Sequence, residues 1–149
     1  VMCIDETFVR EIYGLLRALE CLIYESALPY IDDELIGELK AVNEEIGLIA
    51  AGQTLSTGYI DLNTKFHGLI MSRGGNSKAI ELYRYYHMLI RALRKSYMPS
   101  IVRVQAVYGE HEELIAALEK KDALAIKAAV DKHVGHAMEN FLKVYAGQI

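Results

Sequence analysis

Apolar residues recur three or four positions apart along most of this chain, and no segment shows the strict alternation that is typical of a β-strand. Proline, glycine and helix-capping residues divide the pattern into about six segments. The expected helices run over about 5–28, from Asp32 or Asp33 to near 52, over about 57–72, from Asn76 or Ser77 to Pro99, over about 101–119, and from a cap at Asp122 to about 145. Short connections between long amphipathic helices predict an all-α antiparallel bundle, built by one domain over residues 1–149.

Three of the five histidines lie in the middle of apolar stripes, at His67, His111 and His133. A buried imidazole needs a hydrogen-bond or metal partner. A single inward histidine is usually satisfied within the core, but three on three different helices indicate a shared site if they meet in space. The pattern therefore predicts that these three side chains point into the bundle and share a site there.

The numbering suggests that two of the three histidines do meet. His111 and His133 are equally far from Asp122, where the last two helices are expected to turn back on each other. Residues equidistant from the turn of an antiparallel pair lie at the same height, here about 15 Å from the turn at about 1.5 Å per residue. Asn63 lies four residues before His67 and faces the same way.

These four side chains form a candidate metal-ligand set, Asn63, His67, His111 and His133. Three neutral imidazoles and one amide oxygen suit zinc, nickel or manganese. The set carries no negative charge, so a bound ion would attract an anion, and an octahedral ion would leave positions for water or a carboxylate.

Several short segments carry a family resemblance. They are Arg17, Leu19 and Glu20 in the first helix, Asp61 to Asn76 with Phe66-His67 and Gly75-Asn76, and Glu110-His111 followed by Leu114, Ile115, Leu118, Asp122 and His133. Together they resemble the FadR C-terminal ligand-binding domain (FCD) of GntR-family bacterial transcription regulators. The resemblance implies a helical bundle with a central cavity, in which Asn63, His67, His111 and His133 bind a metal. It also implies a small organic acid that docks at the metal and changes DNA binding by a linked winged-helix domain.

The sequence departs from the family pattern at two positions. Asn63 stands where an aspartate is common, and Leu16 stands where the family often has an arginine in the pocket. Weaker candidates for effector contacts are Arg17, Tyr83, Arg84, Tyr86 and His87. Glu110 is open to two interpretations, a hydrogen-bond partner for another metal histidine or a solvated glutamate.

Composition limits the partners of the chain. A formal net charge of −4 and the lack of a basic stripe argue against direct nucleic-acid binding. The nearest basic group, Arg84, Arg91, Arg94 and Lys95, is interpreted as a solvated helix face. DNA would be reached only through the N-terminal winged-helix domain of the family, which this chain lacks, and the start at Val1 suggests a piece of a longer protein.

Other features suggest where and how the protein works. No apolar run is long enough for a membrane span. Two distant cysteines, Cys3 and Cys21, fit a reducing cytoplasm. The family resemblance implies a homodimer, because paired winged-helix domains generally read two half-sites.

Three rival functions remain at this stage. One is a metalloenzyme that acts on a small metabolite, in which a three-histidine metal activates water. We expect no enzyme, because no acidic residue was found on the stripes near the histidines and no His-Glu-x-x-His motif occurs. The others are a metal-free helical module that binds an apolar ligand, and a purely structural protein in which the histidines bond to one another.

Overall fold

The computed structural model describes residues 5–53, 58–93 and 99–145. Within these ranges the chain forms six α-helices and one short 3-10 turn, and no strand. The elements are α1 (Glu6–Ala27), η1 (Leu28–Tyr30), α2 (Asp33–Ala50), α3 (Tyr59–Ser72), α4 (Ser77–Leu93), α5 (Ile101–Glu119) and α6 (Ala123–Tyr145). The predicted all-α bundle of about six helices is confirmed.

The helix ends follow local side-chain chemistry. Asp32 accepts a hydrogen bond from the backbone N–H of Leu35, and Asn76 accepts one from Ala79, which settles the two capping positions that the sequence left open. Asp122 caps α6, as predicted. The first helix ends at Ala27 rather than Leu28, because Pro29 enters the 3-10 turn η1. The expected start of α3 at Thr57 and the expected end of α4 at 94–98 lie outside the described residues.

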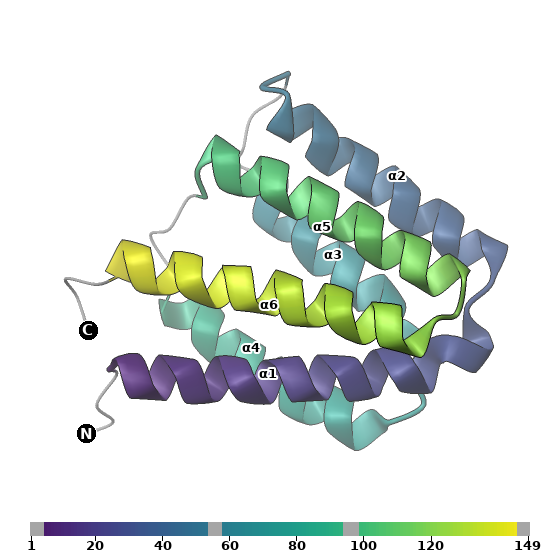
Figure 1. The fold of residues 1–149 in the computed structure, drawn as a ribbon, viewed down its shortest axis with the longest axis horizontal. Coiled ribbons are helices and arrows are strands. Elements are labelled where there is room, and N and C mark those ends of the chain that lie inside the picture. The colour runs from purple at the N-terminus through teal and green to yellow at the C-terminus, as the bar shows by residue number, and fades with distance from the viewer. Residues whose placement is uncertain (1–4, 54–57, 94–98, 146–149) are drawn as a thin grey trace.

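Four helices form a row in the order α2, α5, α6 and α1, with α3 and α4 behind them (Figure 1). α3 packs against α2 and α1, and α4 packs mainly against α1. The largest fully buried side chains include Tyr24, Phe66 and Phe141, so the core runs through α1, α3 and α6. This arrangement turns α3, α5 and α6 toward a common interior.

Two further observations concern candidate properties from the sequence. None of the described helices combines the length and the apolar character that a transmembrane segment requires. Cys21 is a free, half-buried thiol, and Cys3 lies outside the described residues.

Candidate metal centre

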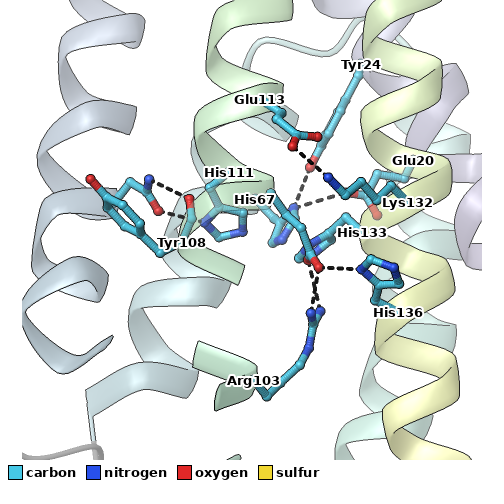
Figure 2. A network of polar contacts seen from close by, with 12 residues as sticks. Glu20, Tyr24, His67, Arg103, Tyr108, His111, Glu113, Lys132, His133 and His136 are labelled. Atoms are coloured by element: carbon cyan, nitrogen blue, oxygen red, sulfur yellow. Dashed lines mark hydrogen bonds and ion pairs between the residues drawn. The ribbon is translucent and has the colours of Figure 1, made fainter. Parts of the chain in front are cut away.

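His67, His111 and His133 come together from α3, α5 and α6 (Figure 2). Their exposed fractions are 7%, 0% and 8%, so all three are buried. The His111 and His133 rings lie 5.2 Å apart, which is the side-by-side placement that their equal distance from Asp122 predicts. One nitrogen from each ring can be chosen so that all three lie within 4.8 Å of one another, which is a spacing that a single metal ion can bridge.

Two of the histidines direct Nδ1 at an oxygen acceptor. His133 Nδ1 lies 2.7 Å from Glu110 Oε2, and His111 Nδ1 lies 3.2 Å from Asn43 Oδ1. The amide of Asn43 has a fixed orientation, because its Nδ2 donates to the Tyr108 carbonyl and to Glu112. An oxygen that only accepts requires a proton on Nδ1, and this leaves Nε2 of both rings with a free lone pair.

His67 has two partners at Nδ1. Tyr24 Oη lies 2.6 Å away and Glu20 Oε1 lies 3.0 Å away. The contact with Glu20 is close but is not an aligned hydrogen bond, because Glu20 Oε1 has no hydrogen-bond partner among the described residues. A carboxylate at this distance favours a proton on Nδ1, so Nε2 of His67 is also left as the ligating nitrogen.

Glu110 joins the centre to α5 and α6 through a buried ion pair. Only 4% of Glu110 is exposed, and the guanidinium of Arg103 donates to both carboxylate oxygens, at 2.7 and 3.1 Å. His136 Nδ1 lies 2.7 Å from Oε1. Of the two interpretations of Glu110 from the sequence, the structure therefore supports the partner of another histidine and excludes the solvated glutamate.

Three buried polar atoms at or beside the centre lack a hydrogen-bond partner among the described residues. They are Nε2 of His111, Oδ1 of Asn63 and Oε1 of Glu20. Leaving such atoms buried and unpaired costs about 1–3 kcal/mol each. A metal ion held by the three rings would satisfy Nε2 of His111, and Asn63 lines the same cavity as His67 and His133. Protonated Nδ1 atoms that donate to oxygen acceptors are the usual arrangement around metal-bound histidines. The residues present therefore fit a divalent metal with nitrogen and oxygen ligands.

The electrostatics favour the neutral form of His111 and His133 and the charged form of Glu110. Burial, followed by the neighbouring positive charges that His133 and His67 would carry, holds the pKa of His111 well below its ordinary value. Burial also lowers the pKa of His133, against the opposing effect of Glu110. Burial raises the pKa of Glu110, but hydrogen bonds from His133 and Arg103 outweigh it and lower the pKa to about 2. Neutral imidazoles are the form that binds metal.

A cavity of about 80 Å³ lies beside the histidines. Its lining comes from α1, α3, α4 and α6: Tyr13, Leu16, Glu20, Asn63, His67, Tyr83, His87, Ile90, Arg91, His133, Val134 and Ala137. Of the weaker effector candidates, the structure brings Tyr83 and His87 to this cavity.

Three weaker candidates do not line the cavity. Arg17 points away toward Asp131, with 3.6 Å between Nε and Oδ1, because a helix turns about 100° between it and Leu16. The ring of Tyr86 packs against Tyr85, and Arg84 lines an outer groove instead.

Sequence reasoning missed Glu20 and Arg91. Glu20 is only 2% exposed and lies four residues after Leu16 on the buried face of α1, so the expectation that no acid lies on a stripe near the histidines is wrong. Burial raises the pKa of Glu20, but its interactions with His67, and then with His133 and Tyr24, outweigh burial and lower the pKa below its ordinary value. Arg91 is exposed, as the interpretation of a solvated face implies, and it also lines the cavity, which the sequence did not indicate. Arg94 and Lys95 of the same group lie outside the described residues.

Comparison with known proteins identifies a family whose model matches most of the chain. The family model described as "FCD domain" matches residues 11–136. The chain is 29% identical over 136 residues to the uncharacterized HTH-type transcriptional regulator YdhC of Bacillus subtilis (strain 168). This match covers 91% of the chain but 61% of YdhC, so the chain spans less than two thirds of the length of this relative. No solved structure matches the chain significantly.

Proposed function

The chain belongs to the FCD domain family, and from this premise we propose that it is the effector-sensing domain of a GntR-type transcription regulator. In this proposal Asn63, His67, His111 and His133 hold a divalent metal, with zinc as the first candidate and nickel or manganese as alternatives. A small organic acid binds beside the metal and alters DNA binding by a linked winged-helix domain. The similarity to an HTH-type regulator supports the regulatory part of the proposal.

The observation that carries the metal proposal is the state of the ring nitrogens. Nδ1 of each of the three histidines faces an oxygen atom, while Nε2 of His111 is buried and unpaired next to the other two rings. Hydrogen bonding among the histidines alone leaves this atom without a partner. A purely structural role therefore accounts for the arrangement less well than a metal does.

The size and the lining of the cavity support a small acid as the effector. At about 10–15 Å³ per water-sized probe, a cavity of about 80 Å³ holds only a few heavy atoms, far less than the roughly 300–1,000 Å³ of typical drug-sized sites. Glu20, His67 and Arg91 give it charged and polar walls. A bound divalent ion would carry two positive charges. The carboxylate of Glu20 would neutralise only one of them. The site would therefore attract an anion, and a long apolar ligand fits it poorly.

Other parts of the proposal concern the whole protein. We expect DNA contact through a winged-helix domain outside this chain, a homodimer and a cytoplasmic location. The formal net charge of −4 is consistent with DNA contact made elsewhere.

Elemental analysis of the purified chain and of its His111→Ala/His133→Ala double variant tests the metal site. We expect close to one zinc, nickel or manganese ion per wild-type chain and less than about a tenth of that in the double variant, since each missing ligand costs much of the affinity. His87→Ala is the control, because His87 lines the cavity but is not among the three clustered rings. Absence of metal from the wild type after incubation with each of the three ions would remove the metal from the proposal.

Glu20 gives one reason to test a second function. It is a buried carboxylate that lines the cavity beside His67, which is where a metalloenzyme would need a general base. Glu110 does not serve this role, because Arg103 and two histidines occupy its oxygens. We expect no turnover when the metal-loaded protein is screened with small esters and amides. A hydrolysis rate abolished both by chelation and by Glu20→Gln would establish the enzyme instead.

A further inference from the structure

Three basic side chains lie along one face of α4. Arg84, His87 and Arg91 are spaced i, i+3 and i+7, and all three line an open groove beside Thr64 of α3. The groove has a volume of about 660 Å³, several times that of the inner cavity. It therefore has room for a group that the inner cavity does not accommodate.

The groove and the inner cavity are adjacent. His87 and Arg91 line both of them. A molecule bound beside His67 and His133 would therefore have the groove on α4 next to it. His87 and Arg91 lie at the boundary of the two spaces, and Arg91 is the one of the two with a permanent positive charge.

The groove carries a positive charge that the described residues do not neutralise. No acidic residue lines it. Arg84 and Arg91 form no ion pair with any residue that the structure describes, whereas the other four described arginines each pair with a carboxylate. Arginine side chains in this state are suited to bind an anionic group through charge-assisted hydrogen bonds.

The inner cavity, in contrast, has room for one anionic group at most. It is small, and Glu20 already places a buried negative charge in its wall. A second anionic group next to Glu20 would be repelled and only partly solvated, which is strongly unfavourable. An effector with two anionic groups would therefore place the second one toward Arg91.

We propose that the α4 groove is a second anion-binding subsite, and that the effector is a small acid with two anionic groups. One carboxylate lies at the histidine end of the cavity, and a second anionic group, carboxylate or phosphate, lies between Arg91 and Arg84. This inference rests on the proposed function, since it assumes that the first carboxylate binds at the metal-loaded histidines. It extends that function by specifying the charge of the effector and the helix that selects it.

A matched ligand series tests the subsite by isothermal titration calorimetry on the zinc-loaded protein. Lactate, 2-hydroxybutyrate, malate and 3-phosphoglycerate share one 2-hydroxy acid head and differ in the group attached to it. We expect malate or 3-phosphoglycerate to bind at least about tenfold more tightly than 2-hydroxybutyrate, which is the effect of roughly one charge-assisted hydrogen bond. The stronger of the two identifies the second group as a carboxylate or a phosphate.

Variants on α4 test whether Arg84 and Arg91 cause the preference for an acid with two anionic groups. Arg84→Gln/Arg91→Gln is expected to remove the preference for malate or 3-phosphoglycerate. Arg84→Gln alone, at a residue that lines the groove but not the inner cavity, is expected to weaken this preference and to leave the Kd of lactate within about threefold. Lys78→Gln is the matched control, since it removes one positive charge from the same helix, at an exposed residue outside the groove that pairs with Glu81. It should retain the preference.

The outcomes separate this inference from the proposed function. If lactate and 2-hydroxybutyrate bind as tightly as malate and 3-phosphoglycerate, or if the double variant keeps the preference, the second subsite is overturned and the sensor function stands. If the zinc-loaded wild type binds no acid of the series, both fail. If binding of lactate is lost in His133→Ala while the preference for malate or 3-phosphoglycerate is lost only in the α4 double variant, both are supported.

Discussion

The two sides of the cavity are built differently. The α3 and α6 side of the cavity leads to the metal centre, where the rings of His67, His111 and His133 are buried and held by partners that are themselves buried or fixed by hydrogen bonds. On the α4 side the arginine side chains are exposed, and the helix packs mainly against α1. We infer that the core fixes the metal side, while residues on the α4 side can change with little effect on stability. Metal binding and effector choice should therefore respond to different substitutions.

The largest expected effect comes from the buried ion pair on the histidine side. Arg103→Ala should lower the free energy of unfolding by roughly 3–5 kcal/mol, because it leaves the carboxylate of Glu110 buried without its cation. Lys132→Ala removes an exposed ion pair with Glu113 and should cost no more than about 1 kcal/mol. Urea denaturation of both metal-free variants measures the difference. Equal losses would show that the buried pair does not hold the histidine side in place.

Removal of the metal should have the next largest effect. A ligand present at 100 times its Kd stabilises the folded state by about 2.7 kcal/mol, so chelation should lower the Tm by roughly 8 °C for a chain of this size. His133→Ala should abolish this response, whereas Arg84→Gln/Arg91→Gln should keep it. An unchanged melting curve after verified removal of the metal would contradict the coupling of the site to the core.

The fold was predictable from the sequence because each helix carries its own signals. Apolar periodicity marked the helices, and residues such as Asp32, Asn76 and Asp122 marked their starts. The proximity of His111 and His133 followed from numbering alone, since a hairpin of two helices has one register once its turn is known. These are local properties, and neighbouring helices did not alter them.

The hydrogen-bond partners of the histidines were not predictable in the same way. Asn43 reaches His111 because α2 packs closely on α5, where a Cβ at Gly47 would lie 2.9 Å from the Tyr108 ring. Glu20 reaches His67 because α1 is oriented about its own axis so that the face with Glu20 points toward α3. Such rotations and approaches depend on the packing of several helices together, which one sequence does not specify. A charged residue on an otherwise apolar stripe, as at Glu20, was the one available signal.

A smaller effect is expected from pH in the metal-free protein. The pKa values of His111 and His133 are lowered in the folded state, chiefly by burial, so the unfolded chain binds more protons below about pH 6.5. Stability should then fall as the pH decreases from 7 to 5.5, by roughly 2 kcal/mol in total. The lowered pKa values of Glu20 and Glu110 contribute stability that is lost only below about pH 4.5. Urea midpoints across this range measure the slope, and His111→Gln/His133→Gln should flatten it.

The smallest effect is expected at Arg17, the arginine that the sequence offered for effector binding. Its guanidinium faces Asp131 at 3.6 Å, both side chains are about half exposed, and the residue does not line the cavity. Arg17→Ala should therefore change the free energy of unfolding by less than about 0.5 kcal/mol and leave the Kd of malate unaltered. Arg91→Gln, which removes the same charge from α4, should weaken malate binding several-fold in the same titration. If Arg17→Ala weakens malate binding as much as Arg91→Gln does, anion recognition comes from α1, and the division between a metal side and an effector side on α4 fails.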